Sequence, residues 1–147
     1  MGPVQRSVAT LRIWGDNLDP TDITRLLGCP PTFAQTKGER VISRHTGTVR
    51  FARAGMWRLC AADREPQDLD GQIAEVLSKL TDDVSVWNAI AERYKLDLFC
   101  GLFMNGRNEG VSISPRALSA LGLRHIELGL DIYGGDDDSE PENPDRP

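Results

Sequence analysis

The sequence predicts an α+β domain with two layers, in which a mainly antiparallel sheet carries helices on one face, with ferredoxin-like character. Three observations lead to this class. Apolar and polar residues alternate over residues 9–14 and 126–133, which is typical of half-buried strands. Apolar residues recur at helical spacing over residues 69–80. Short, turn-rich segments between the remaining strands favour antiparallel pairing, with the helices packed together on one side.

The first strand is predicted over residues 9–14 and is followed by a short helix over residues 20–27. Asp19 is expected to accept hydrogen bonds from the free N–H groups of the first helical turn. Pro20 occupies the first helical position, where its missing N–H costs nothing. Gly28 can adopt the left-handed conformation that ends a helix. Both ends of this helix are therefore specified locally.

The middle of the chain is predicted to hold a ragged hairpin over residues 41–62, with Gly55 near its turn. The clearest helix follows over residues 69–80, with Asp68 as its cap and Leu77 on its apolar stripe, so that Leu77 is expected in the core. Asp82 or Asp83 can cap a second helix, whose buried face is expected to hold four residues: Trp87, Ile90, Ala91 and Tyr94.

Residues 96–104 are nearly all apolar, which predicts a central strand that is covered on both faces. A hairpin loop is expected next, with a return strand that starts at residues 111–113. A helix start at residues 114–115 then repeats the pattern of a capping residue followed by proline seen at residues 19–20. This repetition is either an internal pseudo-repeat or a coincidence, because the pattern is common. The last strand is predicted over residues 126–133.

The chain is predicted to form one domain over residues 7–133, between a flexible N-terminus (1–6) and an acidic, disordered tail (134–147). The tail contains six acidic residues and one arginine, which account for the whole formal net charge of −5. Acidic and basic residues therefore balance in the domain itself. A balanced domain has no global field that would attract nucleic acid or an anionic membrane.

Cysteine usage and the N-terminus favour a cytoplasmic protein. The three cysteines are odd in number and widely spaced, which indicates reduced thiols. Cys60 and Cys100 lie in apolar, strand-like surroundings and are expected in the core. No apolar run is long enough to span a membrane, and the N-terminus shows no apolar region of a secretory signal.

Several short segments together resemble a bacterial family that is catalogued as domain of unknown function 4279. They comprise Ile23-Thr24, Leu26-Leu27-Gly28, Pro31-Thr32, Lys37-Gly38, Trp57 and Leu130-Asp131-Ile132-Tyr133. The resemblance covers about residues 7–133. It implies a small bacterial intracellular protein, and it brings no activity, cofactor or catalytic residue with it.

No catalytic residue, metal site or cofactor is predicted from the residues. His45 and His125 lack a neighbouring Cys or His at ligand spacing. The acidic cluster of Asp16, Asp19 and Asp22 could form a magnesium or acid–base site. Helix capping and complementarity with the helix dipole already account for two of its three carboxylates.

The strongest candidate surface is the basic stretch from residue 37 to residue 58, which has a clear local excess of positive charge. Its candidate partner-binding residues are Lys37, Arg40, Arg50, Arg53, Trp57 and Arg58. The leading hypothesis is a non-enzymatic protein-interaction domain, in one version an immunity protein, whose partner is a protein with an acidic surface. One alternative is a small enzyme or ligand-binding domain with a pocket between sheet and helices. Another is nucleic-acid binding through the basic hairpin, against which the balanced charge of the domain argues.

Overall fold

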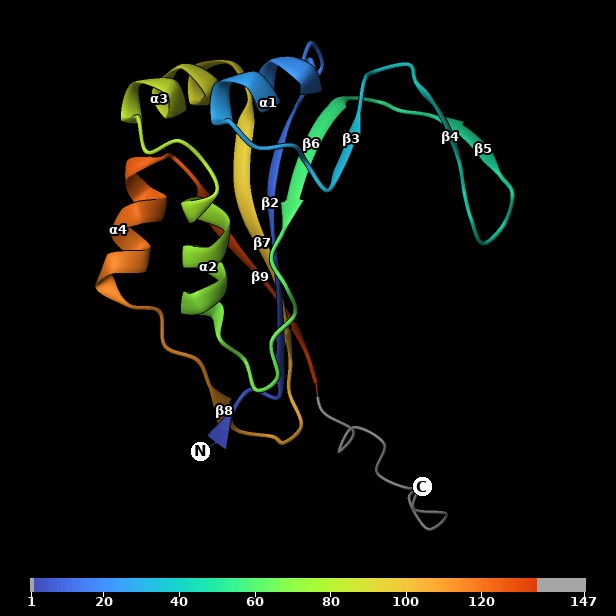
Figure 1. Cartoon of the computed structure of the whole chain (residues 1–147). Coiled ribbons are helices and arrows are strands. Elements are labelled where there is room, and N and C mark those ends of the chain that lie inside the picture. The colour runs from blue at the N-terminus through green and yellow to red at the C-terminus, as the bar shows by residue number, and fades with distance from the viewer. Residues whose placement is uncertain (1, 135–147) are drawn as a thin grey trace.

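The computed structural model describes residues 2–134 and is built around one five-stranded sheet (Figure 1). All neighbouring strands in it are antiparallel except the last pair, β7 and β9, which run parallel. This arrangement confirms the α+β class and the mainly antiparallel sheet. In spatial order the strands are β3 (Phe33–Gln35), β6 (Gly55–Cys60), β2 (Arg6–Gly15), β7 (Lys95–Phe103) and β9 (Glu127–Tyr133).

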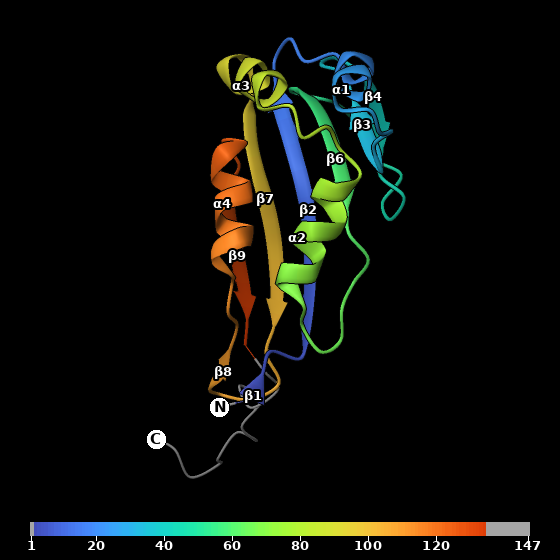
Figure 2. The same cartoon turned by 60° about the vertical axis from the view of Figure 1, so that its left-hand side comes forward.

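The helices gather on one side of this sheet and at one of its ends (Figures 1 and 2). Figure 2 shows α2 and α4 lying along the same face, with α1 and α3 near the upper end of the strands. Each helix turns its apolar stripe toward a common core. In the described part of the chain, the second face of the sheet carries no helix. The helices are α1 (Pro20–Leu27), α2 (Leu69–Ser78), α3 (Val84–Arg93) and α4 (Pro115–Leu123).

The helix starts follow the local rules expected from the sequence. Asp19 accepts a hydrogen bond from the backbone N–H of Thr21 at 3.0 Å, and Gly28 has the positive φ of 81° that a left-handed stop requires. Asp68 and Ser114 cap α2 and α4 in the same way. Both α1 and α4 connect strands that run in the same direction. The internal pseudo-repeat stays a prediction.

Two tryptophans anchor the core, and each has a partner for its ring N–H. Trp57 on β6 is fully buried and donates to the hydroxyl of Thr24 on α1 at 3.1 Å. Trp87 on α3 is equally buried and donates to the carbonyl of Thr81 at 2.8 Å. Leu77, which the helical pattern placed in the core, is only partly buried. The reason is that its part of α2 faces a groove rather than the sheet.

The predicted long hairpin over residues 41–62 is wrong. The structure instead has a short hairpin of β4 (Arg40–Ile42) and β5 (Val49–Phe51), which projects away from the domain (Figure 1). Gly55 does not lie in a turn, because it begins β6 in the main sheet. A Cβ atom at Gly55 would come within 2.4 Å of the carbonyl oxygen of Leu18, so close packing accounts for this glycine.

The end of β7 also differs from the prediction. No return strand starts at residues 111–113; instead β8 (Glu109–Gly110) pairs in parallel with β1 (Gly2–Pro3). Residues 2–6, predicted to be flexible, therefore include the paired strand β1 and the first residue of β2. The chain then passes through α4 to the parallel strand β9. From β2 to β7 the elements follow the ferredoxin-like β-α-β-β-α-β unit, with the β4–β5 hairpin inserted between the neighbouring antiparallel strands β3 and β6, and with α4 and β9 added after it.

The prediction that β7 is covered on both faces is wrong as well. Alternate residues of β7 face solvent, and the ring of Phe99 is 37% exposed. The first strand, the last strand and β7 do lie in one sheet, as the sequence predicts. Nearly all of the predicted acidic tail lies outside the described residues. Within residues 2–134, no helix is both long and apolar enough to cross a membrane.

Candidate functional site

The β4–β5 hairpin stands clear of the domain and is held only at its base. Ala52 is buried there, and its backbone accepts from Gly38 and donates to Glu39, both at 2.8 Å. The pairing of Arg40 with Phe51 sets the register of the two strands. An isolated two-stranded hairpin has marginal stability in water. The folding of the domain does not explain why this hairpin projects into solvent, whereas a binding role for its exposed side chains would.

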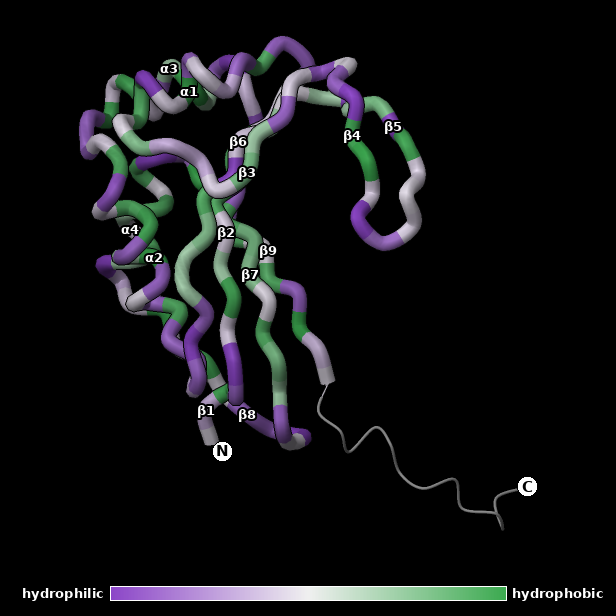
Figure 3. Tube along the Cα trace, turned by 45° about the vertical axis from the view of Figure 1, so that its right-hand side comes forward, coloured by the Kyte–Doolittle hydropathy of each residue, from purple (hydrophilic) through white to green (hydrophobic). Residues whose placement is uncertain are grey.

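One face of this hairpin is apolar and exposed. Ile42, Val49 and Phe51 are exposed by 58%, 43% and 65%. Residues two apart on a strand share a face, and Ile42 and Val49 are paired across the hairpin, so the three side chains form one patch. Figure 3 shows the hydrophobic segments of both arms far from the helices. A patch of this kind marks an interaction site more often than a scattered surface residue does.

Four arginines on and beside the hairpin have no partner in the described chain: Arg40 shares the face of the apolar patch, Arg50 lies on the opposite face with Val41, and Arg44 and Arg53 lie outside the paired residues. Among residues 2–134, the guanidinium groups of Arg40, Arg44, Arg50 and Arg53 make no ion pair and no hydrogen bond, and all four residues are exposed. Lys37 nearby contacts Asp16 at 3.4 Å. We call the exposed apolar and arginine side chains together the hairpin surface. It consists of Arg40, Ile42, Arg44, Val49, Arg50, Phe51 and Arg53.

The structure does not bring all the predicted partner-binding residues together. The prediction that Trp57 belongs to the partner-binding surface is wrong, because its ring lies in the core on the helix side of the sheet. Arg58 follows it on β6 and therefore points to the opposite face, 5.3 Å from the ring of Phe33. The apolar members of the hairpin surface were missed by the sequence analysis. The alternation at residues 40–42 and 49–51 was the available signal.

The uncovered face of the main sheet is a second candidate surface. Arg12 and Asp97 form a two-point ion pair across β2 and β7, with distances of 2.8 and 2.5 Å. The hydrogen bonds that the Arg12 guanidinium donates to Asp97 raise its pKa above its usual value. The same guanidinium lies 4.5 Å from the ring centre of Phe99 and 5.3 Å from that of Trp14. We call this surface the open sheet face, made of Arg12, Trp14, Phe33, Arg58, Asp97 and Phe99.

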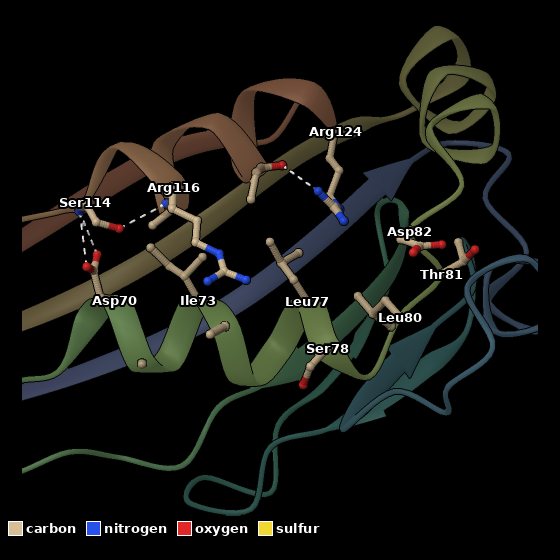
Figure 4. Close-up of a pocket in the computed structure, with 14 residues that line it drawn as sticks. Asp70, Ile73, Leu77, Ser78, Leu80, Thr81, Asp82, Ser114, Arg116 and Arg124 are labelled. Atoms are coloured by element: carbon tan, nitrogen blue, oxygen red, sulfur yellow. Dashed lines mark hydrogen bonds between the residues drawn. The ribbon is translucent and has the colours of Figure 1, made fainter.

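A third site is a groove of about 840 Å³ between α2 and α4, the helix groove (Figure 4). Its floor is apolar, and four small residues on the facing helices leave the space open. Two arginines, Arg116 and Arg124, reach into it from α4 and from the residue that follows α4. The small residues are Gly71, Ala74, Ala117 and Ala120.

The acidic cluster near α1 is divided among separate contacts. Asp19 caps the helix, Asp22 pairs with Arg25 at 2.5 Å, and Asp16 pairs with Lys37. These contacts account for all three carboxylates without a ligand. In the described chain, no group of three or more His, Cys, Asp or Glu residues is placed to hold a metal ion.

The cysteines divide between core and surface. Cys100 is buried, and burial raises the pKa of its thiol to about 12, so little thiolate forms at neutral pH. Cys60 is exposed, which corrects its predicted place in the core. It lies on the open sheet face because β6 turns alternate residues outward, and its sulfur accepts from the Thr10 hydroxyl at 3.5 Å.

Comparison with known proteins yields one match. Residues 5–135 match the family described as "Domain of unknown function (DUF4279)". No curated protein and no solved structure matches the chain. The match covers most of the chain, and the family description names no activity.

Proposed function

The chain belongs to the family described as Domain of unknown function (DUF4279), and we propose that it is a non-enzymatic protein-interaction domain. The hairpin surface binds the partner. The observation that carries this proposal is the exposed Phe51 on a hairpin whose arginines, among them its paired neighbour Arg40, have no partner among the described residues. Aromatic residues and arginine are the types that contribute most binding energy at protein interfaces.

The partner is a protein with an acidic rim around an apolar patch. Four unpaired arginines attract such a surface and speed its association, and the effect weakens as salt is added. The hairpin surface itself has no acidic side chain that would repel this partner. In this proposal the protein acts in the bacterial cytoplasm, and neutralising a toxin, as an immunity protein does, is one concrete form of the role.

Photo-crosslinking tests the proposal in cells of the source organism. A photoreactive residue replaces Phe51 in one variant and Val84 in the control. Val84 is also an exposed apolar residue, but it lies at the start of α3. We expect a discrete protein adduct from position 51 and none of the same mass from position 84. Equal adducts at both positions, or none at position 51, would refute the hairpin surface.

Titration calorimetry with the purified adduct partner then measures the energetic role of the hairpin surface. Arg40→Glu with Arg50→Glu should weaken binding by about tenfold or more, because both changes reverse a charge of the hairpin that attracts an acidic partner. Lys79→Glu with Arg93→Glu is the matched control, since it reverses two exposed charges on other elements. Equal affinities for the two double variants would contradict the proposal.

A second candidate function, binding of single-stranded nucleic acid, is favoured by the open sheet face. Exposed aromatic rings beside arginine can stack on bases, and Phe99 with Arg12 offers such a pair. Fluorescence anisotropy with a labelled oligonucleotide separates the two functions. Phe99→Ala should abolish oligonucleotide binding if this candidate is correct, whereas Phe51→Ala should not. Absence of salt-sensitive binding by the unmodified protein would rule it out.

A further inference from the structure

The helix groove lies between α2 and α4, and small residues are among those that line it. Gly71 and Ala74 lie on α2, and Ala117 and Ala120 lie on α4. On the α4 side, larger side chains at Ala117 and Ala120 would narrow the space. Ile73, Leu77 and Leu80 provide the apolar floor. The volume of about 840 Å³ is within the range of small-molecule sites.

Arg124 places a donor without an acceptor at one end of this groove. Its terminal nitrogen donates to the carbonyl of Ala120 at 3.0 Å, but its Nε is buried and has no partner among the described residues. The guanidinium carbon lies 6.0 Å from the ring centre of Trp87. A buried donor without an acceptor costs free energy, and a small rotation of the Arg124 side chain toward an acceptor in the groove would remove this cost.

Arg116 provides a second positive charge over the same floor. Figure 4 shows its guanidinium extending from α4 over the groove, near Ile73 and Leu77. In the described chain it makes no ion pair and no hydrogen bond. The carboxylate of Asp70 is directed elsewhere, because both of its oxygens accept from the backbone N–H of Ser114, at 2.9 and 3.2 Å.

From these contacts we infer that the helix groove binds an organic carboxylate with an apolar body. The carboxylate accepts hydrogen bonds from Arg116 and from the free Nε of Arg124. Guanidinium groups match the planar, two-oxygen geometry of a carboxylate and give short, charge-assisted hydrogen bonds. The apolar body covers Leu77, which is only partly buried, and displaces water from the floor. This site is separate from the hairpin surface and does not depend on the function proposed for that surface.

Titration calorimetry with octanoate tests this inference, with octylamine as the charge-reversed probe, both below their micelle concentrations. We expect saturable binding of octanoate and none of octylamine. Arg116→Gln with Arg124→Gln should weaken octanoate binding by about tenfold or more, because both donors to the carboxylate are lost. Arg44→Gln with Arg50→Gln is the matched control on the hairpin, and it should bind octanoate like the unmodified protein.

Amide chemical-shift mapping shows where octanoate binds. The largest shifts should fall on α2 and α4, and Ala120→Leu, on the α4 side, should remove them by filling the groove while the remaining spectrum keeps its native pattern. Shifts centred on another element would overturn the inference. So would equal binding of octylamine, or octanoate affinity within twofold of the unmodified protein in the Arg116 and Arg124 double variant.

Discussion

Asp19 is a residue whose role depends only on its nearest neighbours in the chain. Its carboxylate accepts from the N–H of Thr21, one of the groups that the first turn of α1 leaves without a helical partner. Pro20 fixes the backbone at the next position, and Gly28 ends the helix eight residues later. All these contacts span a few residues, and therefore the sequence was sufficient to predict them.

Asp19→Ala should lower the free energy of unfolding by about 1 kcal/mol, which is the usual cost of losing a helix cap. Urea denaturation at pH 7 measures it. Asp16→Ala is the control, because Asp16 makes only an exposed ion pair with Lys37, and such pairs contribute little. A midpoint unchanged from that of the unmodified protein would show that the cap does not stabilise α1.

Glu75→Gln should make the free energy of unfolding depend less on pH in the acidic range. The Ala62 N–H and the Arg64 guanidinium donate to Glu75 at 2.8 and 2.6 Å, and these bonds lower the pKa of its carboxyl in the folded protein. The unfolded chain therefore binds a proton first as pH falls below the ordinary value near 4.5. The stabilisation is present above that value and is lost as pH falls through the lower, folded pKa.

Denaturation midpoints of this variant and the unmodified protein, measured between neutral pH and pH about 3, test the prediction. Glu75→Gln should be the less stable protein at neutral pH, and the difference should shrink on acidification. Glu92→Gln is the control on α3, because Glu92 is exposed. A gap that stays constant across this range would show that the ionised carboxylate contributes nothing.

At the scale of elements, α2 shows how a helix divides its residues between two neighbours. Ile73 and Val76 pack on the sheet and are fully buried. Leu77 shares their apolar pattern but faces α4 across the helix groove, where small residues leave it partly uncovered. Helical periodicity identifies the apolar side of a helix, but how tightly that side is packed depends on the facing element.

Ile73→Ala should therefore cost more stability than Leu77→Ala. A fully buried branched side chain loses about 2–5 kcal/mol on truncation to alanine, and a partly buried one loses less because less apolar area leaves the core. Both changes place alanine on the same helix, so the helix propensity term is similar. Guanidinium denaturation gives both values, and an equal or reversed order would mean that Leu77 is part of the core.

At the scale of the whole molecule, the hairpin surface and the core are independent. The main sheet and the helices share one core, whereas the outer strands of the hairpin pair only with each other. Ile42, Val49 and Phe51 leave 58%, 43% and 65% of their surface exposed, and none of them belongs to the shared core. A segment of this kind can change without loss of the fold.

Replacing residues 42–49 by Asn-Gly should leave the free energy of unfolding within about 0.5 kcal/mol of its original value. Asn-Gly suits the tight turn that would then join Val41 to Arg50, which are already paired. Thermal and urea unfolding measure the change. A loss of about 2 kcal/mol or more would show that the hairpin supports the core.

The sequence by itself determined the α+β class, the helix ends and the positions of the long strands. These features follow from caps, prolines and periodic patterns that act over a few residues. It also identified the arginines of the hairpin as a charged cluster. The family resemblance, carried by ordered short segments, is confirmed by the match over residues 5–135.

Only the tertiary structure decided which face of each strand is covered. Trp57 and Arg58 are neighbours in sequence, yet one lies in the core and the other, half-buried, on the open sheet face, because the helices pack on a single side of β6. Phe99 lies in an apolar run and is still exposed, since no helix of the described chain covers its face of β7. The helix groove likewise needs α2 and α4 side by side. Contacts between segments that are distant in sequence decide which side chains are buried and where the groove lies. Patterns over a few residues cannot predict those contacts.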